Sequence, residues 1–129
     1  MLPNEEYTGK KVLVVATFGS ANPERCPAPF MFAGEAAKAG AEAGICFILQ
    51  APQLLKRGVS ENLRAKDGGR TIREFIDEAL GLGVSFYVCD AALQLCNMTP
   101  EDLIEEVEAL VGPSFLIKQG LRSDLVLSF

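Results

Sequence analysis

Short runs of apolar residues recur along the chain and alternate with longer segments of mixed polarity. The runs cover residues 12–17, 45–49, 84–89, 115–117 and 125–129. Within each run the hydrophobic residues are consecutive rather than alternating, which is typical of strands in a parallel sheet that is covered on both faces. The pattern therefore predicts five strands with helices packed on both sides of them.

Three of the intervening segments favour helices. The clearest one begins at Thr99, an N-cap residue, has a proline at its first helical position, and repeats apolar residues with a helical period until a glycine-proline pair. This pattern predicts a helix over residues 100–111. The same spacing predicts a helix over residues 72–80, and a segment rich in alanine and glycine predicts another over about 29–41.

Residues 50–69 carry mixed signals, and we predict a loop there with a short helical turn over residues 53–56. The order of the elements then implies right-handed crossovers between parallel strands. We therefore predict one domain over residues 1–129 with a flavodoxin-like, doubly wound α/β fold. It has a five-stranded, mainly parallel sheet with helices on both faces. In such sheets, ligands bind beyond the carboxyl ends of the strands.

Composition narrows the environment in which this fold works. The 129-residue chain has 12 basic and 17 acidic residues, a formal charge of −5, which argues against nucleic acid as a partner. No apolar run approaches the roughly 20 residues needed to span a bilayer, and no export signal is recognisable. We therefore expect a cytoplasmic protein with no membrane partner, whose four cysteines are reduced thiols.

Cys89 is the best candidate for a reactive group. It ends a predicted strand, and the good helix formers that follow it place the thiol at a strand-to-helix junction on the ligand-binding edge. Free amide groups at a helix N-terminus favour the thiolate, whereas the neighbouring Asp90 carboxylate opposes it. The alternative interpretation is a half-buried strand-end cysteine without chemistry.

The other three cysteines receive different interpretations. Cys46 lies in the middle of a predicted strand, where a thiol behaves as a small hydrophobe, and is expected to be inert. Cys26 lies in a proline-bounded loop on the ligand-binding edge, and its role stays open. Cys96 follows Cys89 by seven residues and is a second candidate for the same pocket, although two helical turns separate them too widely for a disulfide.

Other chemistries lack the residues that they need. The chain has no histidine, no Cys-x-x-Cys pair and no glycine-rich phosphate-binding motif, so we expect no metal and no cofactor. Four basic residues lie close together in the loop over residues 50–69, at positions 56, 57, 64 and 66. Two interpretations are open: these residues belong to a solvated loop, or they attract an anion to the neighbourhood of Cys89.

Three segments together resemble the DsrE/DsrF/TusD-like sulfurtransferase family over nearly the full length. They are residues 86–93 (Phe-Tyr-Val-Cys-Asp-Ala-Ala-Leu), the acidic segment 99–104 and the closing segment 123–129. The resemblance implies a flavodoxin-like sheet, association into homo- or hetero-oligomers, often trimers or hexamers, and a persulfide on the cysteine that matches Cys89. In having a second cysteine in this region, Cys96, the chain resembles the branch of the family that is linked to sulfur oxidation and handles thiosulfate.

The function hypothesis is therefore a cytoplasmic sulfur carrier or sulfurtransferase, with Cys89 and Cys96 as its catalytic candidates. Its expected partners are sulfur-donor and sulfur-acceptor proteins, thiosulfate-like anions and further copies of the chain. Whether the protein is an enzyme stays open. Two alternatives use the same sequence differently: a peroxiredoxin-like thiol redox protein, and a non-catalytic oligomeric interaction module.

Overall fold

A computed structural model describes residues 6–129, in which five parallel strands form one sheet. The sheet order is β4-β3-β2-β1-β5. The strands are β1 (Lys11–Ala16), β2 (Glu42–Phe47), β3 (Ser85–Cys89), β4 (Ala109–Val111) and β5 (Leu125–Ser128). Since all strands run the same way, their carboxyl ends lie along one edge, which is the edge where Cys89 was predicted.

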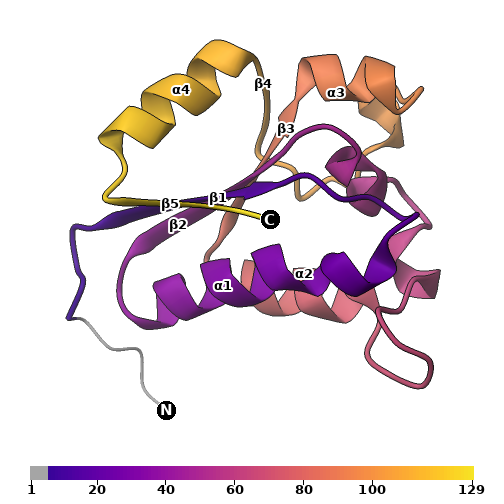
Figure 1. Cartoon of the computed structure of the whole chain (residues 1–129), viewed down its shortest axis with the longest axis horizontal. Coiled ribbons are helices and arrows are strands. Elements are labelled where there is room, and N and C mark those ends of the chain that lie inside the picture. Colours follow the sequence, from indigo (N-terminus) through magenta and orange to yellow (C-terminus); the bar gives the residue numbers. More distant parts are fainter. Residues whose placement is uncertain (1–5) are drawn as a thin grey trace.

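Helices cover both faces of this sheet (Figure 1). One side carries α1 (Pro27–Lys38) and α2 (Ile72–Gly81), and the other carries α3 (Asp90–Leu95) and α4 (Pro113–Arg122). Short 3-10 turns occupy the connections: η1 (Pro23–Arg25), η2 (Ala51–Leu55), η3 (Ser60–Asn62) and η4 (Pro100–Asp102). The predicted parallel α/β fold with helices on both faces is confirmed.

The main hydrophobic core lies between the sheet and the pair α1 and α2. Its centre is an aromatic cluster of Phe30 on α1, Phe47 on β2 and Phe86 on β3, with ring centroids 5.3 to 5.8 Å apart. The strand period of two sends Phe47 and Phe86 to this face and their chain neighbours to the opposite one. Residues 46, 48, 87 and 89 therefore project toward the side of α3 and α4.

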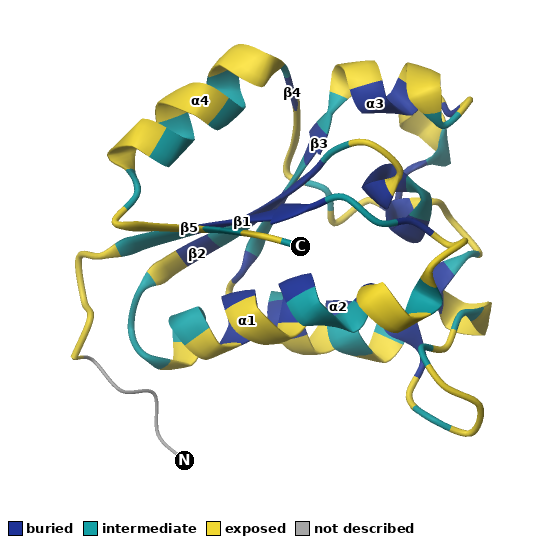
Figure 2. Cartoon of the chain, in the orientation of Figure 1, coloured by how far each residue is buried: buried dark blue, intermediate teal, exposed yellow. Residues whose placement is uncertain are grey.

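The face under α4 is covered more thinly. Leu13, Cys46 and Val111 form a small buried cluster there, against which Phe115 and Leu116 of α4 pack. No residue of α4 itself is fully buried, and Figure 2 shows this helix only in the colours of intermediate and exposed residues. A helix with an apolar side and no buried residue leaves hydrophobic surface in solvent.

The helix predicted over residues 100–111 is wrong. Its N-terminal signal is used, because Thr99 and Asp102 form a capping box, but only the 3-10 turn η4 follows. The amide of Ile104 then donates to the Leu55 carbonyl at 2.8 Å, and the amide of Glu108 donates to Phe86 at 2.8 Å before β4 begins. A helix would bring several carboxylates of this acidic segment together at i,i+4 spacing, which is unfavourable. The backbone instead pairs with its neighbours.

The strand predicted over residues 115–117 is also wrong, because these residues belong to α4. The glycine-proline pair was interpreted as the end of a helix, whereas Gly112 is the N-cap of α4 and Pro113 its first residue. The missing edge strand is supplied by β4, whose residues were assigned to the preceding helix.

The remaining predicted elements are confirmed with small shifts of their ends. Strands at 12–17, 45–49, 84–89 and 125–129 correspond to β1, β2, β3 and β5, and helices at 29–41 and 72–80 correspond to α1 and α2. The loop at 50–69 contains the turns η2 and η3, the first of which overlaps the predicted helical turn.

Candidate functional site

Cys89 is the last residue of β3 and the N-cap of α3, as predicted (Figure 1). Its side chain is partly buried and makes no capping hydrogen bond to the amides of this six-residue helix. The helix therefore fixes the position of the thiol, but the thiol does not turn back onto it. It faces an apolar pocket instead.

This pocket lies where β2, β3 and β4 end and has a volume of about 250 Å³. It opens between α3 and the start of α4, on the thinly covered side of the sheet. Its lining residues come from the three strand ends and the two helices: Cys46, Ile48, Leu49, Cys89, Ala91, Ala92, Leu95, Gly112, Pro113 and Leu116. The position agrees with the rule that places ligands beyond the carboxyl ends of parallel strands.

Cys46 forms part of the same pocket, which the sequence did not reveal. β2 and β3 pair in register with Cys46 opposite Tyr87, so Cys46 and Cys89 are diagonal neighbours on one face of the sheet. Cys46 is fully buried, as expected for a mid-strand thiol. Burial, and secondarily the charge of a Cys89 thiolate, raise the pKa of Cys46 to about 12, so it is a neutral thiol at physiological pH.

Cys96 lies at the other end of α3, where it is the C-cap, and it does not line the pocket. Its thiol donates to the carbonyl of Leu49 at 3.2 Å. Burial raises the pKa of Cys96, opposed by a backbone hydrogen bond at Gln53. The structure thus brings Cys89 together with Cys46 and turns Cys96 toward the loop that follows β2.

Leu49 connects Cys96 to the pocket indirectly. It is a non-glycine residue with a φ of 53°, a conformation that side chains rarely adopt and that its surroundings must hold. The Cys96 thiol donates to the Leu49 carbonyl, and Leu49 also lines the Cys89 pocket. Cys96 is therefore placed to position one wall of the pocket rather than to react within it.

The loop after β1 braces the same region from the other side. Gln53 Oε1 accepts hydrogen bonds from the amide and the hydroxyl of Ser20, both at 3.0 Å, and Gln53 Nε2 donates to the Gln50 side chain at 3.0 Å. The two loops approach so closely at Gly19 that any side chain there would collide with Gln50 and Gln53. The glycine is thus required for the packing of this edge.

Cys26 serves the structure of the loop after β1. It is buried at the start of α1, and its thiol donates to the carbonyls of Asn22 at 3.3 Å and Gly19 at 3.4 Å. Burial, and then the charge of Glu24, raise the pKa of Cys26 to about 11. A buried, hydrogen-bonded, neutral thiol is a poor nucleophile, so the geometry favours a structural role.

The four basic residues of the long loop do not reach the pocket, since none of them lines it. The backbone around Lys56 bridges to Leu103, the amide of Arg57 donates to the Asp102 carbonyl, and the Arg64 guanidinium donates to the carbonyl of Gly69. These contacts hold the backbone of the loop and pair the Arg64 guanidinium with Gly69. Of the two interpretations of these basic residues, the anion site beside Cys89 is not supported, because none of them lines the pocket.

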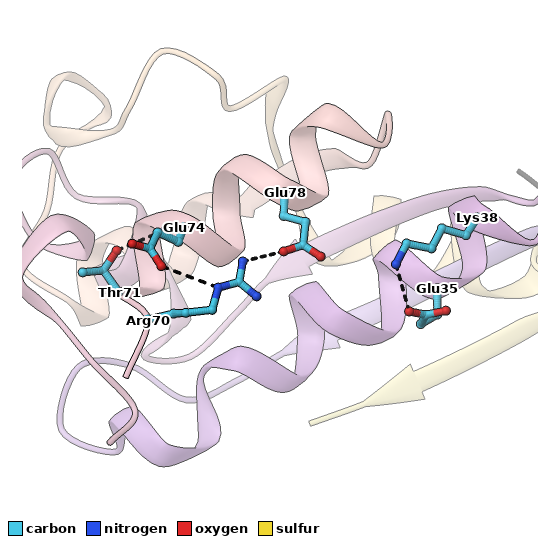
Figure 3. A network of polar contacts seen from close by, with 6 residues as sticks. All are labelled: Glu35, Lys38, Arg70, Thr71, Glu74 and Glu78. Carbon is cyan, nitrogen blue, oxygen red and sulfur yellow. Dashed lines mark hydrogen bonds and ion pairs between the residues drawn. The ribbon is translucent and has the colours of Figure 1, made fainter. Parts of the chain in front are cut away.

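A second hollow, of about 180 Å³, lies between α1 and α2 on the opposite side of the sheet. Its charged residues pair with one another: Arg70 with Glu74 and Glu78, and Lys38 with Glu35 (Figure 3). Each pair lies within or next to a single helix, and no cysteine or serine among the described residues lines the hollow. It has the character of a helix-packing groove, and the Cys89 pocket stays the candidate site.

In residues 6–129, no group of three or more histidine, cysteine or acidic residues is arranged to hold a metal ion. Within the same range no helix is long and apolar enough to cross a membrane.

Fold and site together define a class: a parallel α/β protein with a partly buried thiol at a central strand end, opening into an apolar pocket. The chain belongs to the DsrE/DsrF-like family, whose family model matches residues 10–129. This family is associated with sulfur relay. The resemblance noted from the sequence is thus confirmed at the level of the family.

Two solved structures are similar over almost their entire chains. The crystal structure of the ychN protein from E. coli has a TM-score of 0.77 at 17% identity, covering 93% of this chain and 99% of that one. MTH1491 from Methanobacterium thermoautotrophicum, described as a protein of unknown function, has a TM-score of 0.65 at 15% identity, covering 93% and 98%. At these identities the likeness shows the fold alone. No curated protein matches the sequence.

Proposed function

We propose that this protein is a sulfur carrier that holds sulfane sulfur on Cys89 and passes it to the thiol of a partner. The supporting observation is the Cys89 thiol at the end of β3, partly buried and facing a pocket. Membership in the DsrE/DsrF-like family, with its association with sulfur relay, gives this geometry its chemical meaning.

The proposed reaction needs only the thiolate of Cys89. It attacks the outer sulfur of a donor persulfide, a new sulfur–sulfur bond forms, and the donor thiolate leaves with the electron pair of the broken bond. The product is Cys89-S-SH, and no net oxidation occurs. In the second half, an acceptor thiolate attacks the outer sulfur of this persulfide and restores the Cys89 thiolate. The chemistry requires neither histidine nor metal.

The proposal includes donor and acceptor proteins that carry cysteine persulfides, and a cytoplasmic setting in which thiols stay reduced. The pocket supports it, because enclosure by apolar walls protects a persulfide from water and from competing thiols. An acceptor must bring its thiol to the mouth of the pocket.

The experiment that tests the function is intact-mass spectrometry of the reduced chain after incubation with a hydropersulfide donor, followed by addition of a reduced acceptor thiol. We expect a gain of one sulfur atom and its loss on addition of the acceptor. A parallel assay measures whether the reduced chain consumes peroxide. If it does and no sulfur is gained, the thiol redox alternative is correct. If no thiol reacts with the sulfur donor or with peroxide, the interaction module is correct.

We also propose that the protein forms a homo-oligomer, a trimer or hexamer as in its family, through α4 and β5. Support comes from exposed hydrophobic side chains on these two elements: Ile117, Leu121, Leu125 and Val126. Within residues 6–129, the outer edge of β5 is also unpaired, and such edges favour further contacts. The surface extends the thin face described above.

Replacing Leu121 with Asp tests this association, since Leu121 is 83% exposed in the single chain and its substitution leaves the core intact. An unpaired carboxylate in an interface should weaken association at least about tenfold in the dissociation constant. The measurement is sedimentation velocity across a concentration series. Met31→Asp on α1, at a side chain 54% exposed, is the matched control and should keep the wild-type oligomer. Equal behaviour of the two variants contradicts the assignment.

A further inference from the structure

Among the residues that the structure describes, those that line the Cys89 pocket include no charged side chain and no amide or hydroxyl side chain. Apart from two thiols, the lining consists of aliphatic residues, a glycine and a proline. A bound anion would therefore lose its hydration without gaining a hydrogen bond or a counter-charge from a side chain that lines the pocket. This feature selects among the sulfur compounds that reach Cys89.

The side-chain charge around the pocket acts in the same direction, against the free amides at the N-termini of α3 and α4, which favour an anion. Asp90 follows Cys89 directly and is exposed, and the chain carries a formal charge of −5. A negative protein field lowers the local concentration of anions. The basic residues that would offset it are in the long loop and do not line the pocket.

The second thiol of the pocket is an independent observation that points to a ligand. Cys46 is fully buried and lines the pocket beside Cys89, and its thiol makes no hydrogen bond within the described part of the chain. Two sulfur atoms and aliphatic walls form a soft, polarisable surface. Its chemical complement is a neutral chain of sulfur atoms rather than an oxyanion.

We propose that the pocket takes uncharged sulfane-sulfur compounds, namely protonated hydropersulfides and organic polysulfides, and discriminates against thiosulfate and similar anions. This inference rests on the proposed function and narrows its donor. With a neutral hydropersulfide R-S-SH, the Cys89 thiolate bonds to the outer sulfur and R-S⁻ leaves with the electron pair. The proton stays on the transferred sulfur, and Cys46 contributes contact without changing its bonds.

The test compares two disulfide probes, neutral 4,4′-dithiodipyridine and the dianionic 5,5′-dithiobis(2-nitrobenzoate). Both are attacked by the thiolate. The thiolate fraction therefore cancels in the ratio of the second-order rate constant for the neutral probe to that for the dianionic probe. The same ratio for free 2-mercaptoethanol removes their intrinsic difference. The full chain is used with Cys96→Ser, which leaves Cys89 as its only thiol that is not buried. We expect a ratio at least about tenfold above that of the free thiol.

A pair of charge variants locates the effect. Leu95→Lys adds a cation at the pocket, where the side chain is 54% exposed, and should lower the ratio at least about threefold by accelerating the dianionic probe. Met31→Lys, also 54% exposed, makes the same change of net charge on α1 and should leave the ratio unchanged. A ratio equal to that of the free thiol, or an equal fall in both variants, overturns the proposal.

The two levels of the proposal fail separately. The disulfide probes carry no sulfane sulfur, so their ratio reports the selectivity of the pocket whether or not a persulfide forms. If the chain loads sulfur but reacts with the two probes in the same ratio as the free thiol, the carrier function is retained and the selectivity is overturned. If it prefers the neutral probe but loads no sulfur, the selectivity of the pocket is retained and the carrier function is overturned.

Discussion

Replacing Cys89 with serine is expected to reduce sulfur loading to the level measured without a sulfur donor. The hydroxyl keeps the size and the place of the thiol at the end of β3, but it does not form a nucleophile at neutral pH or a bond to sulfane sulfur. Intact-mass spectrometry after exposure to a hydropersulfide donor measures the result. The sulfur adduct should be lost while thermal unfolding stays close to that of the wild type.

Cys96→Ser is the matched control for this experiment. Its hydroxyl is able to donate to the Leu49 carbonyl as the thiol does, so the wall of the pocket is preserved. We expect loading within about fivefold of the wild type, the effect of weakening one hydrogen bond. Cys96→Ala, which removes the donor, should be slower than Cys96→Ser.

The two variants separate a reacting thiol from a positioning one. If Cys96→Ser alone abolishes loading, Cys96 is the carrier and the proposed assignment is wrong. If an adduct persists when both residues are serine, the sulfur resides on Cys26 or Cys46, and a buried thiol has become accessible. Loss in the Cys89 variant alone agrees with the geometry.

The position of Cys89 was predictable because it depends on local signals. A continuous apolar run ends at Cys89 and helix-forming residues follow it, so the strand, its end and the start of α3 are all specified within a few residues. Parallel strands then bring that end to the edge of the sheet. The same reasoning placed β1 and β2 correctly.

The pocket itself was not predictable from the sequence, because its walls come from segments more than sixty residues apart. Cys46 and Leu116 meet only once α4 packs on the sheet, whereas the apolar run 115–117 within α4 predicts a strand. The side of the sheet that Cys46 faces depends on its register with β3. The available signal was the alternation of side chains along β2 and β3, which puts Cys46 and Cys89 on the same face of the sheet once the two strands are paired in this register.

The error over residues 100–111 has a physical cause that periodicity does not reveal. Leu103 and Ile104 are both buried, and an extended backbone buries them by pairing with residues 55–57. The capping box at Thr99 stabilises a first turn equally well in a 3-10 turn and in a helix. Tertiary hydrogen bonds decided between the two, as they commonly override local propensity.

Phe86→Ala is expected to destabilise the fold by about 3–5 kcal/mol. Phe86 is fully buried in β3, with its ring centroid 5.7 Å from that of Phe30 and 5.3 Å from that of Phe47. Its removal leaves a cavity at the centre of the aromatic cluster, three residues before Cys89. Since domains are typically stable by only 5–15 kcal/mol, the variant should lose a large share of its stability.

Urea unfolding at one fixed protein concentration measures this loss, with Phe32→Ala as the matched control. Phe32 is 49% exposed on α1 and contacts the Phe129 ring at a centroid distance of 4.9 Å, so its loss should cost about 1 kcal/mol. The contrast tests whether the buried aromatic cluster contributes more to stability than an exposed aromatic contact at the margin of the same core. If the two losses are equal, the cluster of Phe30, Phe47 and Phe86 does not dominate stability.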